Sequence, residues 1–384
     1  MKPKIALIYG GYSSEWEVSV KSGKNVFRNI DPLKYDPYEV FMTKESWKVL
    51  LPDGGSEQID RSDFSFVHDG RKITFDKAFI MIHGTPGENG QLQAYFELIE
   101  LPHTGCTAMT STLAFDKFAC KTYLKEAGIV LAKDHFLRRG DSYSPQEIVD
   151  KLGLPLFVKP NQGGSSFGIT KVKRVEDLDA AIEYAFREDD SVLIEECISG
   201  RELTMGIYKV GGELKTLPAT EIIPKNEYFD YEAKYMGASE EVCPADIPQS
   251  VYDKIAAATK RIYRRFGCHG LVRMDYILKG DDPYFLEINP IPGMTDTSLV
   301  PQQVRAAGVD MKEFISNLIE NGQMMKNMRK LVLALASFMV ACTLYGQSGV
   351  VFVDSNSNGV RDAGEAPLAG VVVSDGFSLV KTDA

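Results

Sequence analysis

LVRMDYILKGDDPYFLEINPIPGMT, residues 271–295, is the stretch that decides the fold class of this chain. Its runs 271–278 and 284–289 predict two β-strands, and the Gly- and Asp-containing sequence 279–282 between them predicts a hairpin turn. Apolar side chains from both strands would share one face of the hairpin and form a buried core. They are Val272, Met274, Tyr276, Leu286 and Ile288.

Four polar residues are expected on the other face of this hairpin. Side chains alternate along a strand, so a turn centred near Asp281 places Asp275 roughly opposite Glu287. The same register places Arg273 roughly opposite Asn289. Two carboxylates and an amide oxygen beside a cation suit Mg²⁺ that is bound jointly with phosphate oxygens. The alternative is a surface hairpin with an ordinary cross-strand charge pair.

Composition limits the classes of function that this chain can have. Its 384 residues predict two or three domains, and 44% hydrophobic with 25% charged residues is typical of a globular protein. A net charge of −10 without a basic stripe argues against nucleic-acid binding. The cysteines show no CxxC spacing and the histidines no HExxH pattern, so we expect reduced thiols in a cytosol and no zinc site.

The first 105 residues predict an open α/β layer, because strands near 5–9, 39–42 and 77–81 alternate with helical patterns. Glu15 follows the first strand at an expected helix start, beyond the carboxyl end of the strand, where ligands of such sheets collect. Its other possible role is to favour the helix N-terminus. His83 opens a glycine-rich loop and could be either a structural or a functional histidine.

Residues 106–200 contain a second group of binding signals. The run 156–160 predicts a buried strand with Lys159 near its end, followed at once by the small residues of 161–168. Small residues let backbone N–H groups approach an anion, and serines add hydroxyl donors, so this segment predicts a phosphate-covering loop. A flexible linker is the alternative. Glu195 and Glu202 lie at strand ends, where acceptors can hold an adenine amino group and a ribose hydroxyl. The alternative is that they are ordinary surface glutamates.

The character of the sequence changes after Gly322. A basic cluster at 325–330 leads into the uncharged run 331–345, which is typical of a secretory signal peptide. The run is short for a transmembrane span of about 20 apolar residues.

The last residues predict a different kind of module. Residues 354–365 have the ligand spacing of an EF-hand-type calcium loop, and short strands are expected at 368–373 and 377–381. The tail resembles the start of an exported protein with a calcium-binding, immunoglobulin-like repeat. We interpret it as a fused or read-through neighbouring reading frame. A genuine tail anchor, with the body in the cytoplasm, is the alternative.

Six ordered motifs in the body resemble those of the D-alanine–D-alanine ligases of the ATP-grasp superfamily, over residues 1 to about 322. Each motif alone is weak, and their order carries the resemblance. The motifs are GGYSSEWEVS at 10–19, HGTPGENG at 83–90, Lys159 with GSSFG at 164–168, DYEAKY at 230–235, RMD at 273–275, and EIN, PGMT and SL within 287–299.

The resemblance implies an α/β fold of three ATP-grasp domains followed by a non-catalytic tail. The N-terminal domain, 1–105, would be an open α/β sheet that binds substrate. The central subdomain, 106–200, and the C-terminal subdomain, 201–322, would be α+β lids that clasp ATP. Residues 323–384 would form the tail.

The implied reaction is the ATP-dependent ligation of two D-alanines, through D-alanyl phosphate, for peptidoglycan precursor synthesis. Two Mg²⁺ or Mn²⁺ ions would be held by Asp275, Glu287 and Asn289. ATP would be bound by Lys117, Lys159, Ser166, Glu195, Ile198, Glu202 and Lys234.

The resemblance also implies how D-alanine is held. Glu15 would bind the ammonium of the first D-alanine, with His83 near its reacting carboxylate. The carboxylate of the second D-alanine would lie near Ser298 and Leu299.

Catalytic roles are implied for a second set of residues. Arg273 and the Gly293 N–H would stabilise the oxyanion. Glu15, Ser165 and Tyr235 would form a hydrogen-bonded chain that locks the loops shut, which excludes water.

Three departures from the family pattern are present, at Trp16, Glu196 and Pro290-Ile291. Two other functions stay open: an ATP-grasp ligase of another amino or hydroxy acid, and a surface calcium-binding or anchored protein dominated by its tail. The resemblance implies a homodimer and no nucleic-acid partner. A membrane would be involved only if the 331–345 segment is retained.

Overall fold

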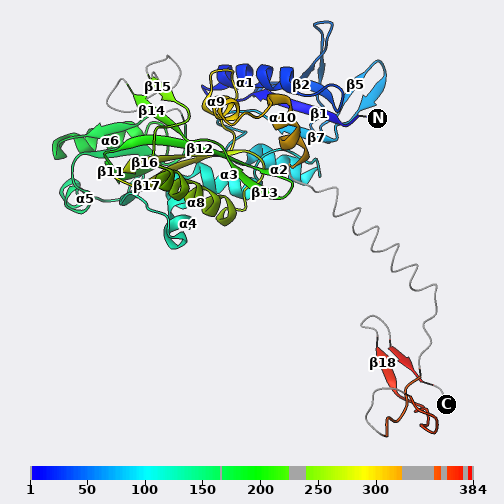
Figure 1. Ribbon diagram of the computed structural model, residues 1–384. Coiled ribbons are helices and arrows are strands. Elements are labelled where there is room, and N and C mark those ends of the chain that lie inside the picture. Colours follow the sequence, from blue (N-terminus) through cyan, green and yellow to red (C-terminus); the bar gives the residue numbers. More distant parts are fainter. Residues whose placement is uncertain are drawn as a thin grey trace. The chain divides into compact units, whose positions relative to one another are not determined.

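A computed structural model describes residues 2–164, 167–224, 239–321, 350–355, 361–374 and 379–382. The chain divides into two compact units, residues 1–326 and 327–384 (Figure 1). Several predictions fall outside the described residues. They concern Ser165, Ser166, Lys234, Tyr235, the apolar run 331–345 and positions 356–360 of the calcium-type loop.

The N-terminal sheet has five strands in the order β4-β3-β2-β1-β7. β1 pairs in parallel with both β2 and β7, so the three strands expected from the sequence form the centre of an open α/β layer. The elements are β1 (Lys4–Gly10), α1 (Trp16–Asn29), β2 (Asp36–Met42), β3 (Trp47–Leu50), β4 (Ser56–Gln58), β7 (Lys77–Ile80) and α2 (Gln91–Leu98), with a separate ribbon of β5 (Phe66–His68) and β6 (Arg71–Ile73).

The central sheet is antiparallel, in the order β10-β9-β11-β8. Helices α5 and α6 pack apolar side chains such as Ile148 and Ile182 into its core. The elements of this part are α3 (Ala108–Phe115), α4 (Lys117–Leu124), β8 (Asp134–Arg138), α5 (Pro145–Leu152), β9 (Leu156–Pro160), β10 (Thr170–Val172), α6 (Leu178–Ala185) and β11 (Ser191–Glu196), with 3₁₀ turns at Lys125–Ala127 and Val175–Asp177.

The third sheet has the order β15-β14-β12-β16-β17, and β13 pairs with the last residues of β12, 207–210. Helix α8 packs against it through buried residues such as Ile255 and Ile262. The elements are β12 (Arg201–Val210), β13 (Glu213–Thr216), β14 (Thr220–Pro224), β15 (Ser239–Val242), α8 (Gln249–Arg265), β16 (Val272–Lys279) and β17 (Asp282–Asn289).

The predicted hairpin is present, and its polar register is confirmed. Arg273 pairs with Asn289, and Asp275 pairs with Glu287. The predicted core face is wrong at one position, because a β-bulge follows Asp275 and brings Phe285, not Leu286, opposite Tyr276. Phe285 is 4% exposed and packs edge-on against Tyr276, with ring centroids 6.1 Å apart. The bulge turns Leu286 toward a cavity.

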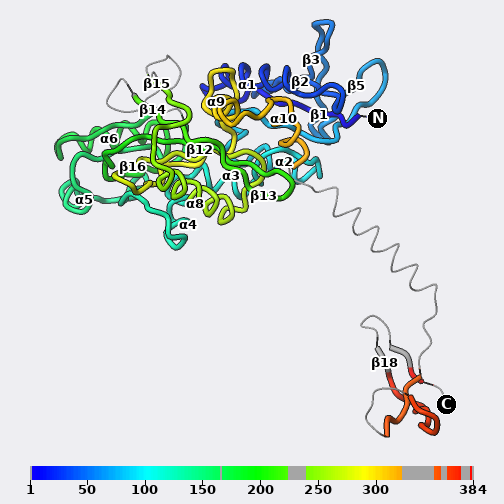
Figure 2. Tube along the Cα trace, in the orientation of Figure 1, coloured from blue at the N-terminus to red at the C-terminus, as the bar shows by residue number. Residues whose placement is uncertain are grey.

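The last two helices of the body return to the N-terminal sheet. α9 (Leu299–Ala306) and α10 (Met311–Glu320) lie near α1 in Figures 1 and 2. Phe314 and Ile315 of α10 are fully buried in the same core as Ile5 and Leu7 of β1. Full burial of one such side chain contributes about 1.5–3 kcal/mol. The loop that joins β17 to α9 is therefore held between the third sheet and the N-terminal sheet.

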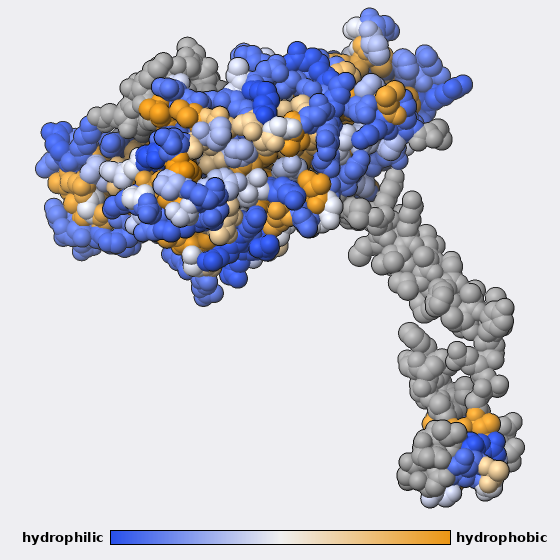
Figure 3. All heavy atoms as spheres, viewed as in Figure 1, coloured by the Kyte–Doolittle hydropathy of each residue, from blue (hydrophilic) through white to orange (hydrophobic). Residues whose placement is uncertain are grey.

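The second unit contains a small antiparallel pair, β18 (Val372–Ser374) and β19 (Leu379–Lys381). β19 lies within the expected range 377–381, whereas β18 only overlaps the expected range 368–373 and ends one residue beyond it. Glu365 is 8% exposed and accepts hydrogen bonds from the backbone N–H groups of Ser355 and Asp362. Among the described residues, no helix is long and apolar enough to cross a membrane. On the face shown in Figure 3, hydrophilic side chains cover most of the described surface.

Candidate active site

A cavity of about 970 Å³ lies among the three sheets of the body. The predicted site residues that the structure describes all line it, although most of them lie far apart in the sequence. They are Glu15, His83, Lys117, Lys159, Glu195, Ile198, Glu202, Arg273, Asp275, Glu287, Asn289, Gly293, Ser298 and Leu299.

The hairpin β16–β17 places its polar face at this cavity. Arg273 donates two hydrogen bonds to the Asp275 carboxylate, at 2.9 and 2.8 Å. Asn289 Nδ2 donates to Asp275 Oδ2 at 3.0 Å, and Thr204 Oγ1 donates to Asp275 Oδ1 at 2.6 Å. Asp275 is 4% exposed, so these contacts hold a buried carboxylate in one orientation. The Asn289 amide oxygen and the Glu287 carboxylate supply further acceptors on the same face.

A buried carboxylate between two ammonium groups joins α4 to the central sheet. Lys159 Nζ donates to Glu195 Oε2 at 2.6 Å, and Lys121 Nζ donates to Glu195 Oε1. Lys121 also contacts Asp134 at 3.2 Å and the carbonyl oxygen of Ala132 at 2.9 Å. Burial acts to raise the pKa of Glu195, but Lys159 and Lys121 outweigh it and lower the pKa to about 2. The sequence analysis did not predict that Lys121 and Asp134, which do not line the cavity, support Glu195 in this cluster.

Lys117 lies at the start of α4 and reaches the glycine-rich loop that follows β9. Its ammonium donates to the carbonyl oxygen of Gly163 at 2.9 Å. Asp116 caps the helix by accepting from the Ala119 N–H at 2.8 Å, which fixes the position of Lys117 at the first turn. The ammonium is therefore held at the edge of the predicted phosphate loop.

Glu15 precedes α1, and its carboxylate lies close to two glycines, Gly84 and Gly164. A Cβ atom added at Gly164 would lie 3.1 Å from Glu15 Oε2, and one added at Gly84 would lie 3.2 Å from the same oxygen. Such contacts are close, so side chains at these two positions would crowd the Glu15 carboxylate. The described part of the glycine-rich loop therefore approaches Glu15 at Gly164.

His83 uses both ring nitrogens within the protein. Nδ1 lies 3.0 Å from the carbonyl oxygen of Ile291, so Nδ1 carries a hydrogen, and Nε2 lies 3.0 Å from Ser22 Oγ. Burial lowers the pKa of His83, which favours the neutral ring. The geometry favours a role for His83 in holding the loop that contains Ile291. Its predicted contact with substrate stays a prediction.

The loop between β17 and α9 forms one wall of the cavity. A Cβ atom added at Gly293 would lie 2.9 Å from Ser298 Oγ, so glycine permits a close approach there. Ser298 Oγ accepts from the Thr295 N–H at 3.0 Å and immediately precedes α9. The first N–H groups of a helix lack intrahelical partners and carry partial positive charge, which suits a carboxylate near Leu299.

Glu88 is a cavity residue that the sequence analysis did not single out. Its carboxylate accepts from the Gly84 N–H at 2.9 Å. Burial, with a smaller effect of the Glu15 carboxylate, raises the pKa of Glu88 to about 8. The signal in the sequence was its place in the loop 83–90, but burial of its side chain could not be read from that loop.

The raised pKa of Glu88 predicts a specific pH dependence of stability. The folded protein holds this proton more tightly than the unfolded chain, so ionisation of Glu88 opposes folding between its ordinary pKa of 4.5 and about 8. Stability from this group is present at low pH and is lost as pH rises through that window. We expect the melting temperature of Glu88→Gln, relative to the unchanged protein, to increase from pH 5 to pH 8. A difference that stays constant over this range would contradict the raised pKa.

The three departures from the family pattern lie in parts of the chain that the structure describes. Trp16 is 45% exposed at the start of α1. Glu196 accepts from the Lys133 N–H at 2.7 Å at the cavity wall. Ile291 is buried in the N-terminal core, while its carbonyl oxygen accepts from His83.

The fold and the site together define an ATP-grasp ligase, in which the three sheets of the body surround a cavity lined by lysines, an arginine and several carboxylates. A family model described as D-ala D-ala ligase N-terminus matches residues 4–106, and one described as D-ala D-ala ligase C-terminus matches residues 123–320. The chain belongs to the D-alanine–D-alanine ligase family.

Named relatives agree with this assignment. The chain is 48% identical over 322 residues to a D-alanine--D-alanine ligase of Phocaeicola vulgatus, covering 84% of this chain and 99% of the relative. It is 46% identical over 316 residues to one of Flavobacterium johnsoniae, covering 82% and 98%. The body is similar to the crystal structure of the VanG D-Ala:D-Ser ligase of Enterococcus faecalis, with a TM-score of 0.76, 34% identity and coverage of 83% and 99%. A D-alanine--D-alanine ligase of Bacillus anthracis complexed with ATP gives a TM-score of 0.68 at 27% identity, with coverage of 85% and 99%.

Proposed function

We propose that this protein joins two D-alanine molecules while it converts one ATP to ADP and phosphate, and that residues of the cavity bind the substrates and catalyse the reaction. The observation that carries the proposal is the position of the Arg273–Asp275 pair. It lies in the same cavity as Glu15, the Lys159–Glu195 pair and the N-terminus of α9. Cationic groups, metal-type acceptors and two substrate anchors therefore meet in one enclosure.

The hairpin fits a divalent metal ion that is shared with a nucleotide. Among the described residues, no group of three or more His, Cys, Asp or Glu side chains is arranged to hold a metal. Asp275, Glu287 and Asn289 offer two carboxylates and an amide oxygen, which is the incomplete oxygen set that Mg²⁺ completes with phosphate oxygens and water. When bound there, Mg²⁺ would offset charge on the triphosphate.

The first step activates one D-alanine. Glu15 binds its ammonium group, and Lys117 and Lys159 orient the phosphates of ATP. A carboxylate oxygen of the amino acid attacks the γ-phosphorus as the bond to the β-phosphate oxygen breaks. The products are D-alanyl phosphate and ADP. Closure of the loops that carry Ser165 and Tyr235 excludes water, which would otherwise hydrolyse the acyl phosphate.

The second step forms the peptide bond. The carboxylate of the second D-alanine is held at Ser298 and at the N-terminus of α9. Its neutral amine attacks the acyl carbon, phosphate leaves with the bonding electrons, and the amine loses one proton. Arg273 and the Gly293 N–H stabilise the negative charge on the carbonyl oxygen in the transition state.

We also propose that the body acts in the cytoplasm as a homodimer.

The substrates are tested by phosphate release from Mg-ATP with the full chain. D-alanine, L-alanine, D-serine and D-lactate are offered separately; D-serine is included because the VanG neighbour is titled a D-Ala:D-Ser ligase. We expect release with D-alanine, and D-alanyl-D-alanine in the product by mass spectrometry. A chain that ends at Gly322 should give the same product. Absence of release with all four compounds, under conditions where ATP binds, would contradict the proposed function.

A further inference from the structure

Helix α1 carries a buried stripe of polar residues that the proposed substrate contacts do not use. Ser19, Ser22 and Asn25 are spaced three residues apart and are 0%, 0% and 4% exposed. An amphipathic helix normally buries apolar residues on this face, and buried polar groups require hydrogen-bond partners. Ser19 bonds within the N-terminal sheet region, to Gly10 and Met81. Ser22 and Asn25 instead reach a loop far away in the sequence.

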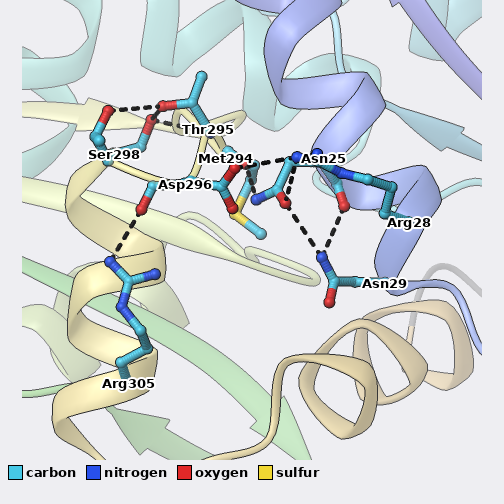
Figure 4. Close-up of polar contacts among 9 residues, drawn as sticks. Asn25, Arg28, Asn29, Met294, Thr295, Asp296, Ser298 and Arg305 are labelled. Carbon is cyan, nitrogen blue, oxygen red and sulfur yellow. Dashed lines mark hydrogen bonds and ion pairs between the residues drawn. The ribbon is translucent and has the colours of Figure 1, made fainter.

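Ser22 and Asn25 hold both polar groups of one backbone residue, Met294. The Met294 N–H donates to Ser22 Oγ at 3.1 Å, and Asn25 Nδ2 donates to the Met294 carbonyl oxygen at 2.8 Å. Figure 4 shows Asn25 of α1 directed at the loop that carries Met294. The Met294 side chain is 1% exposed and is buried in the N-terminal core. This residue is therefore fixed at its N–H, its carbonyl and its side chain.

The same network extends to the preceding turn of the loop. Because Ser22 Oγ accepts from Met294, its hydroxyl hydrogen is available to His83 Nε2 at 3.0 Å. His83 Nδ1 in turn donates to the carbonyl oxygen of Ile291 at 3.0 Å. The carbonyl groups of Ile291 and Met294 and the N–H of Met294 are thus connected to α1. Gly293 lies between these two residues in the loop.

We propose that Ser22 and Asn25 are positioning residues for the second D-alanine. Met294 lies between Gly293, which is proposed to stabilise the oxyanion, and Thr295, whose N–H donates to Ser298 Oγ at 3.0 Å. Holding Met294 therefore sets the distance between the oxyanion donor and the site of the acceptor carboxylate. The inference deepens the proposed function and rests on it.

The two steps of the reaction depend on this loop to different extents. Activation of the first D-alanine uses Glu15, the lysines and the metal-binding hairpin, none of which contacts Asn25. Attack by the second D-alanine requires its amine to be aligned with the acyl carbon, and a displacement of 1 Å in such an alignment can reduce a rate by about 100-fold. A displaced loop should therefore impair peptide bond formation more than activation.

Asn25→Asp tests the inference with a minimal change. An aspartate can still accept from Arg28 and Asn29, which donate to Asn25 Oδ1 at 3.4 and 3.2 Å, but it cannot donate to Met294. Hydroxylamine measures activation independently: its nitrogen attacks the acyl carbon of D-alanyl phosphate, phosphate leaves, and a hydroxamate forms. We expect the ratio of dipeptide to hydroxamate to fall by about tenfold or more in Asn25→Asp. Ser22→Ala, which removes the acceptor for the Met294 N–H, should change the ratio in the same direction.

Asn29→Asp is the matched control. It makes the same substitution one turn along α1, and the Asn29 side chain donates to Asn25 without contacting the loop. We expect its dipeptide-to-hydroxamate ratio to stay close to that of the unchanged protein. An unchanged ratio in both Asn25→Asp and Ser22→Ala would overturn the inference. If the unchanged protein formed neither product, the proposed function would fail instead.

Discussion

Asp275→Asn should lower the rate of ligation by about 1,000-fold, because it removes a charge at the centre of the polar hairpin. The Asp275 carboxylate is 4% exposed and accepts four hydrogen bonds, two of them from Arg273. An asparagine would turn an N–H₂ group toward donors from Arg273, Asn289 or Thr204. The change should therefore weaken metal binding and also release Arg273 from its orientation. Phosphate release at a series of Mg²⁺ concentrations measures the effect.

Asp282→Asn provides the control for this prediction. It makes the same substitution in the same hairpin, at an exposed position whose contact is a 3.5 Å ion pair with Lys254. Such a pair contributes about 1 kcal/mol or less, so the activity should change little. If Asp275→Asn ligated D-alanine as fast as Asp282→Asn at every Mg²⁺ concentration, Asp275 would have no part in metal binding or catalysis.

The hairpin shows which structural features could be predicted from local sequence. Side-chain alternation and a short turn sufficed to predict that Asp275 faces Glu287 and Arg273 faces Asn289. The bulge after Asp275 was missed, because an extra residue in one strand leaves the apolar pattern almost unchanged. Its effect was to exchange Leu286 for Phe285 in the core. The local pattern therefore predicted the chemistry of the hairpin better than its packing.

Contacts between distant segments could not be predicted in the same way. Glu195 and Lys121 are 74 positions apart, and Asn25 and Met294 are 269 apart. The sequence offered Glu195 as a binding acceptor, and it offered no reason to pair it with a lysine of α4. The polar stripe on α1 was likewise overlooked, because its partner is a backbone segment with no side-chain pattern of its own. Packing of α9 and α10 onto the N-terminal sheet brings that segment to α1.

Glu195→Gln should lower the free energy of unfolding at pH 7 by about 3–5 kcal/mol, since it removes one partner of a buried ion-pair cluster. Lys121 is 2% exposed, and the Lys159 side chain is 12% exposed. Both ammonium groups would lose their shared counter-charge, and Asp134 would be left to balance Lys121. Because the pKa of Glu195 is lowered from 4.5 to about 2 on folding, its ionised carboxylate stabilises the folded protein fully at neutral pH. This stabilisation is lost as the pH falls from 4.5 to about 2. Urea unfolding at pH 7 gives the size of the change.

Glu196→Gln separates this effect from a general sensitivity of β11. The neighbouring carboxylate accepts one hydrogen bond from the Lys133 N–H at 2.7 Å, and glutamine can still accept it. We expect a loss of about 1 kcal/mol or less for this variant. Equal losses in the two variants would mean that the buried cluster does not stabilise the central sheet. A large loss in Glu195→Gln alone would show that Lys159 is held by a structural carboxylate. The proposed contact of Lys159 with ATP would then be made by an ammonium group that is already oriented.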